Sequence, residues 1–464
     1  MDQGEEFDVV VVGAGPAGEV VAGRLADGGL SVALVERELV GGECSFYACM
    51  PSKALLRPAQ ALAEARRVPG AEQASGGALD VGAVLARRDE IVHELHDGEQ
   101  LPWLAKRSIA LRRGHGELAG TRSVCVGEQM LSARRAVVLA PGTGALIPPI
   151  PGLGEADPWT NRQATTAHAV PESLLVLGGG VVGVEMACAY ASLGSRVTIV
   201  EALPRLIAGE EELASREVVE ALGQAGVEVI LGVKAVAVRR EPASGAGGAR
   251  GPVTLELEDG RTLTGAELLV AVGRRPRTEE LGLELLGLEP GKPVDVTDAM
   301  QVPGHDWLYV VGDANGRALL THMGKYQARL AADHILGRPV ALRSDGHLSP
   351  RVIFTEPQVA AVGHTLASAT AAGLAARSVD VALSANAGSS FVGHGAPGRA
   401  RIVVDEDRGV IVGATFTGVE VAESLHAATI AIIGEVPIER LWHAVPCFPT
   451  RSEVWLNLLE EYAR

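Results

Sequence analysis

Two cysteines with four residues between them, Cys44 and Cys49, lie in the stretch VGGECSFYACMPSKALL of a 464-residue chain. The chain holds only five cysteines, too few for a disulfide-built scaffold, so a close pair indicates redox or metal chemistry. A zinc site would need two further ligands, usually from a second short cysteine or histidine pair. The other three cysteines stand alone and no His-x-x-x-His occurs, which disfavours a metal site. Because a reducing cytosol opens structural disulfides, the sequence favours a redox-active pair over a structural staple.

The backbone between these cysteines must depart from a regular helix if their sulfurs are to form a bond. Residues five apart in an α-helix are separated by about 7.5 Å along its axis, whereas the Cα atoms of a disulfide lie within ~7 Å. Gly41 and Gly42 before the pair and Pro51 after it predict an irregular helix start. A thiol at a helix N-terminus is also stabilised as the thiolate, which is the reactive form.

A second pattern occurs twice: a buried strand, a Gly-x-Gly-x-x-Gly turn, a helix, and a second strand that ends in an acid. The two copies are Gly13, Gly15, Gly18 with Glu36, and Gly178, Gly180, Gly183 with Glu201. Such glycines let a backbone approach a pyrophosphate at the helix N-terminus, and the acid takes ribose hydroxyls. The acid follows the first glycine at the same spacing in both copies, which ordinary tight turns would not reproduce. Two dinucleotides are expected, and one should be a flavin, because two nicotinamides would have nothing to exchange.

Glu201 bears on the choice of nicotinamide cofactor. A carboxylate at this position hydrogen-bonds a free 2′-hydroxyl and repels a 2′-phosphate, so the sequence favours NADH. Arg205, four residues further on, could soften that preference and leaves NADPH possible.

Charge and length limit the remaining possibilities. The formal net charge is −16 with no basic run, which excludes nucleic acid and anionic membrane as partners. No stretch approaches the ~18 apolar residues of a membrane helix, and the N-terminus is acidic, so we expect a soluble cytoplasmic protein. The length predicts roughly three domains. The segment EPASGAGGARGP, residues 241–252, is expected to form a mobile hairpin.

The cysteine stretch GGECSFYACMPSK resembles the Gly-Gly-x-Cys-x4-Cys-x-Pro-Ser/Thr-Lys signature of the FAD-dependent pyridine nucleotide-disulfide oxidoreductases, which include dihydrolipoamide dehydrogenase, glutathione reductase and mercuric reductase. The resemblance extends to both glycine motifs, to LLVAVGRRPRT at 268–278, to LYVVGDA at 308–314 and to RVIFTEPQVAAVG at 351–363. It implies an α/β fold with two Rossmann-like dinucleotide-binding domains, for FAD and NAD, and a C-terminal α+β dimerisation domain in a homodimer. The expected domains are 1–150 (FAD, first part), 151–272 (NAD), 273–345 (FAD, second part) and 346–464 (dimerisation).

The resemblance also implies a relay in which NADH reduces one face of FAD and a disulfide on the other face is reduced in turn. Cys49 would be the thiolate in contact with the flavin, and Cys44 the outer thiol that attacks a substrate. Lys53 would lie near the flavin N5 and pair with Glu185, while Asp313 would hold the ribityl chain. Beyond the two glycine motifs and their acids, the cofactor contacts expected are Arg37, Gly42, Lys53, Gly142 and Gly273.

The chain departs from the family pattern near its C-terminus. The family's His-Pro-Thr-x-Ser-Glu motif has its counterpart in HAVPCFPTRSEVW, where the histidine that shuttles protons is replaced by Phe448. A phenyl ring transfers no proton, and general acid-base assistance is typically worth ~10²- to 10⁴-fold in rate. We therefore expect ordinary dithiol-disulfide exchange to be slowed, which makes the chain a poor match to a plain dihydrolipoamide dehydrogenase.

Three residues could compensate for Phe448. His443 could swing in, although a lone histidine near an interface is more often structural. Cys447 could act as a third redox thiol, although unpaired cysteines are usually small buried hydrophobes. Glu453, if buried against Phe448, should have a raised pKa and could itself carry the proton.

Phe46 and Tyr47, between the two cysteines, are bulkier than the small residues usual in the family there. They could narrow the approach to Cys44 or simply pack as core.

Two functions of different kinds remain open on this basis. The first is an enzyme that passes electrons from NADH through FAD to Cys44-Cys49 and on to a small disulfide or similar electrophilic acceptor. The alternative is a flavoprotein reductase whose acceptor is a quinone or dye that meets the flavin directly, or a dihydrolipoamide dehydrogenase-like subunit with impaired dithiol exchange. A non-catalytic binding protein is disfavoured, because it has no use for the Lys53 and Glu185 pair beside the flavin.

Overall fold

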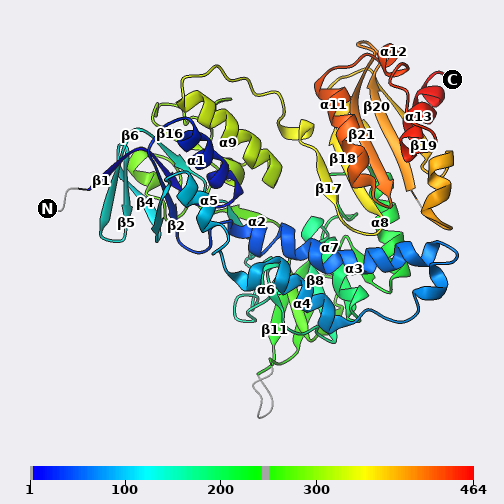
Figure 1. Ribbon diagram of the computed structural model, residues 1–464. Helices are drawn as coiled ribbons and strands as arrows, with labels where there is room; N and C mark the ends of the chain where they lie inside the picture. Colours follow the sequence, from blue (N-terminus) through cyan, green and yellow to red (C-terminus); the bar gives the residue numbers. More distant parts are fainter. Residues whose placement is uncertain (1–3, 243–249, 397) are drawn as a thin grey trace. The chain divides into compact units, whose positions relative to one another are not determined.

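The computed structural model describes residues 4–242, 250–396 and 398–464 of the chain. These residues form two compact units (Figure 1). The first unit comprises the described residues within 1–51, 87–146 and 274–346, and the second comprises those within 52–86, 147–273 and 347–464. The expected domain boundaries near 150, 272 and 345 stay predictions, and the helical segment 52–86 groups with the second unit.

The first unit is built on a mixed sheet in the order β3-β2-β1-β6-β5-β4, with β16 paired to β6. Its strands are β1 (Glu5–Val12), β2 (Val32–Glu36), β3 (Ala110–Arg113), β4 (Gly116–Gly120), β5 (Ser123–Val126), β6 (Gln129–Leu139) and β16 (Leu308–Val310). The pairs β1-β2, β1-β6, β2-β3 and β6-β16 are parallel, and β4, β5 and β6 pair antiparallel. The parallel part is the dinucleotide-binding half that the first glycine motif predicts.

The second half of β1, residues 9–12, is buried on both faces, which explains the uninterrupted run of valines before the first glycine motif. Val9 and Val11 pack in one cluster with Leu25 of α1 (Pro16–Asp27) and Ala328 of α9 (Thr321–Ile335). Val10 and Val12 face a second cluster, to which the antiparallel strands β4 and β5 contribute.

Shorter elements complete the first unit. They are α2 (Gly42–Phe46), α5 (Leu101–Lys106), the paired strands β7 (Thr143–Ala145) and β15 (Arg274–Pro276), and single turns of 3₁₀ helix at His93–Leu95, Leu283–Leu286 and Gly312–Asn315. Helices α3 (Cys49–Arg67) and α4 (Val81–Ile91) each have residues in both units.

The second unit contains a parallel sheet in the order β10-β9-β8-β14, which carries the second glycine motif. Its strands are β8 (Ser173–Leu177), β9 (Arg196–Glu201), β10 (Glu228–Leu231) and β14 (Glu267–Val270). Beside it lies the antiparallel sheet of β11 (Ala235–Arg240), β12 (Val253–Leu257) and β13 (Thr262–Gly265), and the helices are α6 (Asn161–Thr166), α7 (Val181–Ser192) and α8 (Glu212–Gln224). Strands β11 and β12 flank the expected mobile hairpin, of which residues 243–249 lie outside the described residues.

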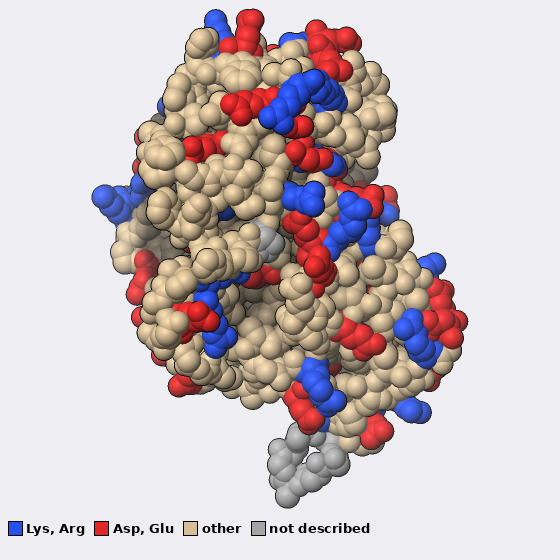
Figure 2. Space-filling model, turned by 90° about the vertical axis from the view of Figure 1, so that its right-hand side faces the viewer, with Lys and Arg blue, Asp and Glu red and all other residues tan. Residues whose placement is uncertain are grey.

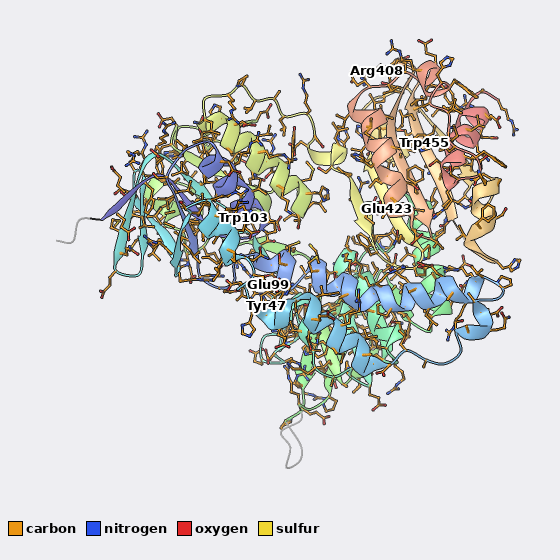
Figure 3. All side chains as sticks on the ribbon, in the orientation of Figure 1. Tyr47, Glu99, Trp103, Arg408, Glu423 and Trp455 are labelled. Carbon is orange, nitrogen blue, oxygen red and sulfur yellow. The ribbon has the colours of Figure 1, made fainter. Side chains whose placement is uncertain are left out.

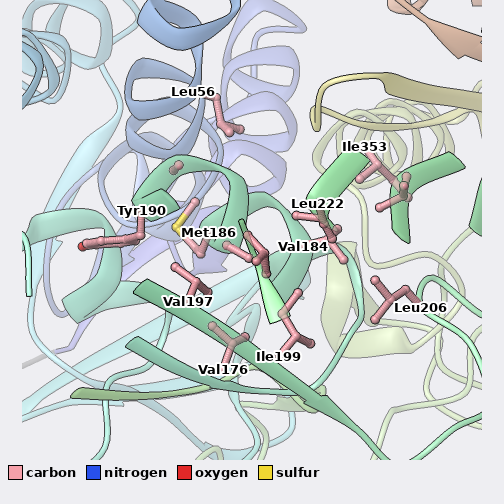
Figure 4. Close-up of a cluster of buried hydrophobic side chains, with 14 of the residues drawn as sticks. Leu56, Val176, Val184, Met186, Tyr190, Val197, Ile199, Leu206, Leu222 and Ile353 are labelled. Carbon is pink, nitrogen blue, oxygen red and sulfur yellow. The ribbon is translucent and has the colours of Figure 1, made fainter. Parts of the chain in front are cut away.

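Helix α7, which follows the second glycine motif, is held by apolar packing (Figure 4). Val184 and Met186 of this helix lie in one buried cluster with Val176 of β8 and Ile199 of β9. Leu56 of α3 belongs to the same cluster, so α3 is packed onto α7 within the second unit. This packing sets the positions of Lys53 on α3 and Glu185 on α7.

The C-terminal part of the second unit is an antiparallel sheet in the order β17-β18-β21-β20-β19. Its elements are β17 (Arg351–Ile353), β18 (Gln358–Gly363), β19 (Ala376–Ala382), β20 (Gly398–Asp405) and β21 (Val410–Gly418), with helices α10 (Leu366–Ala371), α11 (Leu425–Ile433), α12 (Ile438–Leu441) and α13 (Val454–Tyr462). Trp455 of α13, labelled in Figure 3, packs edge-on against Phe416 of β21. The α/β class with two dinucleotide-binding sheets and a C-terminal α+β region is confirmed.

Two further features are the distribution of charged side chains and the length of the helices. On the face shown in Figure 2, basic and acidic side chains are interspersed. Within the described parts of the chain, no helix is both long enough and apolar enough to span a membrane.

Candidate active site

The two cysteines of the first unit lie on either side of a helix break. Cys44 belongs to the single-turn helix α2, which ends at Phe46, and Cys49 is the first residue of α3. Gly41 and Gly42 precede the break with φ angles of +113° and +59°, in the left-handed region that glycine adopts without strain. The interrupted helix expected from the Cys-x4-Cys spacing is confirmed.

The thiols of Cys44 and Cys49 are half-buried and interact with each other. A hydrogen bond to Cys49 and burial raise the pKa of Cys44. The Sγ of Cys49 also lies 3.5 Å from the Oγ1 of Thr321, at the start of α9. The two thiols therefore lie close enough to act as one redox pair, and Cys49 has a hydroxyl neighbour in Thr321.

The two aromatic residues between the cysteines differ in burial. Phe46 is only 2% exposed and packs as core, whereas Tyr47 is half-buried, with its ring centroid 6.5 Å from that of Phe46. Figure 3 labels Tyr47 at the end of α2. Of the two interpretations left open by the sequence, core packing therefore holds for Phe46.

The first glycine loop leaves space where a dinucleotide backbone would pass. A Cβ on Gly13 would lie 2.2 Å from the Ala140 carbonyl oxygen, and one on Gly18 would lie 1.8 Å from the Gly13 carbonyl oxygen. By contrast, a Cβ on Gly15 would meet nothing within 4 Å. Gly42 closes one side of the loop, because a Cβ added to Gly42 would lie 2.7 Å from the Gly15 Cα. The loop thus fits a pyrophosphate over Gly15.

The second glycine loop repeats this pattern in the second unit. A Cβ on Gly178 would lie 2.5 Å from the Ala271 carbonyl oxygen, and one on Gly183 would lie 2.0 Å from the Gly178 carbonyl oxygen. A Cβ on Gly180 would again meet nothing within 4 Å. The two loops therefore share one construction, with the first and third glycines required by packing and the second open to a ligand.

The acids at the ends of β2 and β9 also behave alike. Glu36 accepts hydrogen bonds from the Ala14 and Glu38 amides, at 2.7 Å each. Glu201 accepts them from the Gly179 and Leu203 amides, at 2.6 and 2.7 Å. Each acid therefore ties its glycine loop in place, and its oxygens keep further lone pairs that could accept ribose hydroxyls.

Asp313 lies in a polar cluster of the first unit. Its carboxylate accepts a hydrogen bond of 2.6 Å from the Thr143 hydroxyl, which in turn accepts one of 2.6 Å from the Arg274 guanidinium. Burial raises the pKa of Asp313. The neighbouring Glu43 pairs with Arg277 at 3.2 Å, so the residue before Cys44 is linked to the segment after the second dinucleotide-binding sheet.

Lys53 and Glu185 form an ion pair in the second unit, with the Lys53 Nζ 2.7 Å from the Glu185 Oε2. The Glu185 side chain is 4% exposed, and its other oxygen accepts a hydrogen bond from the Phe354 amide. The Lys53 Nζ also lies 4.7 Å from the centroid of the Phe354 ring, a cation-π contact. The structure thus brings together the two residues that the sequence pairs.

The remaining cofactor candidates are placed as follows. Arg37 is exposed, 3.8 Å from the Glu38 carboxylate, and Gly142 has a φ of +70° with open space at its Cβ position. Gly273 has a φ of +147° and closes the second dinucleotide-binding segment.

The C-terminal candidates do not form a proton-transfer group within the single chain. Phe448 is 76% exposed, so it gives Glu453 no burial, and the Glu453 carboxylate accepts a hydrogen bond from the Gly388 amide. His443 and Cys447 are both exposed. This placement favours an anchoring role for Glu453.

Sequence reasoning missed several residues around the cysteines. Thr321 contacts Cys49, and the charge of Lys325 on the same helix acts on Cys44. Glu19, in the first turn of α1, is a half-buried acid whose raised pKa the charge of Lys325 partly offsets. No short motif marks these residues. The polar sequence THMGK, which begins the helix after LYVVGDA, was a signal that could have identified Thr321 and Lys325.

Two dinucleotide-binding loops and a thiol pair on one chain define the class as a nicotinamide- and flavin-dependent oxidoreductase. Residues 7–329 match the family described as pyridine nucleotide-disulphide oxidoreductase, and residues 349–459 match the dimerisation domain of that family. The chain belongs to the pyridine nucleotide-disulphide oxidoreductase family. It is an NAD(P)H-dependent disulfide oxidoreductase, and the family implies FAD as the bound flavin.

Curated relatives resemble the chain over almost its full length. The dihydrolipoyl dehydrogenase of Haloferax volcanii is 30% identical, with 98% of this chain and 95% of that protein covered. That of Rhizobium etli is 30% identical, with 99% of both covered, and that of Chlorobaculum parvum is 33% identical, with 97% and 95% covered.

Solved structures share the fold. The HOCl-induced flavoprotein disulfide reductase RclA from Escherichia coli superposes with a TM-score of 0.85 at 24% identity, covering 98% of this chain and 99% of that one. LpdA from Mycobacterium tuberculosis gives 0.84 at 24% identity, covering 99% of each chain.

Proposed function

We propose that the protein passes electrons from NADH through FAD to the disulfide of Cys44 and Cys49, and from there to a small disulfide or comparable electrophilic acceptor. The observation that carries this proposal is the contact between the two thiols, with the Cys49 sulfur 3.5 Å from the Thr321 hydroxyl oxygen. Disulfide reduction needs two neighbouring sulfurs: one attacks the acceptor, and the other then attacks the first to release the reduced product. When bound, FAD supplies the two-electron centre between nicotinamide and thiols.

The chain's own residues support the separate parts of this relay. Cys44 is the proposed nucleophile toward the acceptor, and Cys49 the sulfur that stores charge. Lys53, held by Glu185, supplies a fixed cation, and Asp313, held by Thr143, supplies a buried hydrogen-bond acceptor. The proposed contacts to the two dinucleotides are Gly13, Gly15, Gly18, Glu36, Arg37, Gly42, Gly142 and Asp313 for FAD, and Gly178, Gly180, Gly183, Glu201 and Gly273 for the nicotinamide.

NADH is the proposed reductant. The Glu201 carboxylate ends β9 beside the second glycine loop, where it would repel a 2′-phosphate. Arg205 donates to the backbone carbonyls of Ala208 and Glu210, so its guanidinium is engaged in folding its own loop. The ratio of kcat/KM for NADH to that for NADPH should exceed ten, and Glu201→Ala should lower this ratio. A wild-type ratio near one would contradict the assignment.

An anaerobic titration of the purified flavoprotein with NADH tests the relay. We expect a long-wavelength thiolate-to-flavin absorbance to appear before the flavin itself bleaches. Alkylation with a mass tag should then find two more reactive thiols after reduction than before. Bleaching without the long-wavelength band, and with no gain in thiols, would refute the proposal.

A direct flavin-to-quinone or flavin-to-dye reductase is the second candidate, and Phe448 favours it, because dithiol exchange loses a proton carrier there. The variant Cys44→Ser separates the two. If the protein is a disulfide reductase, Cys44→Ser should abolish nearly all turnover with lipoamide. If it is a direct reductase, the variant should keep its quinone turnover, and both the wild type and the variant should show little lipoamide activity.

The match to the dimerisation domain supports a homodimer. Exposed apolar side chains of the C-terminal part would be covered by the second copy: Phe391, Ile430, Ile433, Trp442, Val445, Phe448 and Leu456. Sedimentation velocity of the purified protein would test this state. A pair that cycles between thiols and disulfide also suits a reducing compartment, and we propose the cytoplasm.

A further inference from the structure

The loop 202–211, which joins β9 to α8, lies against the second glycine motif. The Ile207 amide donates a hydrogen bond of 2.8 Å to the Gly179 carbonyl oxygen. The Leu206 side chain packs on the same glycine, because a Cβ added to Gly179 would lie 2.3 Å from the Leu206 Cδ2. Both side chains are buried, and Leu206 is fully removed from solvent. The loop therefore helps to fix the backbone of the second glycine motif.

The backbone of this loop is strained at Ile207. Its φ angle is +42°, in the left-handed region, where a β-branched residue is an outlier. Such a conformation persists only where the surrounding contacts hold it. One contact comes from the end of the loop, because the Glu210 amide donates a hydrogen bond of 2.9 Å to the Ile207 carbonyl oxygen. The position of Glu210 is therefore linked directly to the strained residue.

Two buried carboxylates end the loop, and arginines of the C-terminal sheet hold both of them. Arg351 of β17 donates to Glu210 Oε1 at 2.6 Å, and Glu210 is 8% exposed. Arg401 of β20 donates to Glu211 Oε2 at 2.9 Å, and the Leu366 amide donates to the other Glu211 oxygen at 2.7 Å. The Oε2 atom of Glu210 accepts no hydrogen bond from a described residue, so the countercharge of Glu210 depends on Arg351. Removing either arginine would strand a buried anion.

Apolar contacts join the same sheet to the loop. Ile353 of β17 and Val359 of β18 lie in one buried cluster with Leu206 and Ile207. Figure 4 labels Leu206 and Ile353 within this cluster. All of these residues belong to the second unit, in which the loop is held by the glycine motif and by the C-terminal sheet together.

We propose that Arg351 and Arg401 are positioning residues of the nicotinamide site. Through Glu210 and Glu211 they hold the loop 202–211 against the second glycine motif, so that affinity for the nicotinamide dinucleotide depends on the C-terminal sheet. This inference rests on the proposed function, in which the second glycine motif binds that dinucleotide. Both arginines lie within residues 349–459, the match to the dimerisation domain, so this region also supports cofactor binding.

The test is a calorimetric titration of the oxidised, FAD-loaded protein with NAD⁺, which cannot reduce the flavin. Arg351→Met and Arg401→Met should each raise the Kd for NAD⁺ by about ten-fold, within the range of effects that act through a contact network. The FAD content per chain should stay unchanged. In stopped-flow reduction by NADH, the half-saturating concentration should rise by the same factor. The limiting rate should stay within about two-fold of wild type, because the loss is one of ground-state binding.

A matched ion pair in the same unit separates this role from general stability. Arg240 lies 2.7 Å from Glu267, and each of these side chains is 10% exposed. Glu267 begins β14, whereas the second glycine motif meets Ala271, just beyond the other end of that strand. Arg240→Met should therefore lower the melting temperature but keep the Kd for NAD⁺ within about two-fold of wild type. A Kd raised as much as in Arg351→Met would overturn the inference.

Two further variants address charge and folding. Arg351→Lys keeps a cation for Glu210, so its Kd should lie closer to wild type than to Arg351→Met. Should Arg351→Met fail to fold, the double variant Arg351→Met with Glu210→Gln decides the question, because it leaves no buried charge unpaired. Its Kd should still be raised, since the loop has lost its anchor, and a wild-type Kd would overturn the inference.

The outcomes distinguish this inference from the proposed function. If Gly180→Ala weakens NAD⁺ binding while both arginine variants keep the wild-type Kd, the positioning role alone is wrong. If Gly180→Ala leaves NAD⁺ binding unchanged, or the wild type binds no NAD⁺, the assignment of the second glycine motif is wrong and the inference falls with it.

Discussion

The Lys53 ammonium group lies 2.7 Å from the Glu185 carboxylate, on two helices that one apolar cluster holds together. The charge on Glu185 is almost fully removed from solvent, whereas about a third of the Lys53 side chain remains exposed. Removing the cation therefore strands a buried anion, but removing the anion leaves a lysine that water can reach.

Replacement of Lys53 should consequently be the more damaging change. We expect Lys53→Met to lower the free energy of unfolding by about 2 kcal/mol, below the 3–5 kcal/mol of a fully buried pair because solvent screens part of the interaction. Glu185→Gln should lower it by less, because the amide oxygen can still accept from the Phe354 amide. Urea unfolding of both variants at pH 7 measures the difference, and equal losses would contradict the asymmetry.

The glycine loops provide a matched pair of substitutions. Gly15→Ala places a methyl group in open space, so the unfolding free energy without FAD should stay within about 0.5 kcal/mol of wild type. Its affinity for FAD should fall by at least ten-fold, because the methyl group occupies the approach of the pyrophosphate. Gly18→Ala, in contrast, drives a methyl group against the Gly13 carbonyl and should destabilise the protein even without cofactor.

The second loop serves as the internal control. Gly180→Ala should weaken nicotinamide binding and leave the FAD content unchanged, and Gly183→Ala should destabilise the second unit. Flavin absorbance and calorimetric titration with NADH measure these effects. Loss of FAD from the Gly180→Ala variant would show that the two loops do not each bind a separate dinucleotide.

These loops also show what the sequence could predict. A strand, a glycine turn, a helix and an acid follow one another directly along the chain, so local spacing predicts both loops and the positions of Glu36 and Glu201. The contact of Thr321 with Cys49 joins residues 272 positions apart, and α9 packs on α1 where a Cβ on Gly324 would lie 3.4 Å from the Ala17 Cβ. No local pattern encodes such contacts, because they depend on how α1, α9 and the start of α3 are packed in the first unit.

Burial of Glu19 should make stability depend on pH. Its pKa in the folded protein, about 7, exceeds its ordinary value of 4.5, so the folded state binds the proton more tightly than the unfolded state. The stabilisation is complete below about pH 4.5 and is lost as the pH rises through about 7, at most about 3 kcal/mol in all. Urea unfolding at pH 5.5 and 8 should therefore show a smaller loss of stability in Glu19→Gln than in wild type. An equal loss of stability in both proteins would show that a group other than Glu19 causes it.

The contact between Thr321 and Cys49 should control the charge on the inner sulfur. A hydroxyl group that donates to a thiolate stabilises it, so Thr321→Val should raise the apparent pKa of the long-wavelength band in the NADH-reduced protein. A lost hydrogen bond to a charged group of about 1.5 kcal/mol corresponds to a rise of about one pH unit. Thr321→Ser keeps the hydroxyl and should titrate as wild type does, which separates the hydrogen bond from the loss of packing. If the Thr321→Val and Thr321→Ser variants titrate alike, the Thr321 hydroxyl does not hold the charge on Cys49.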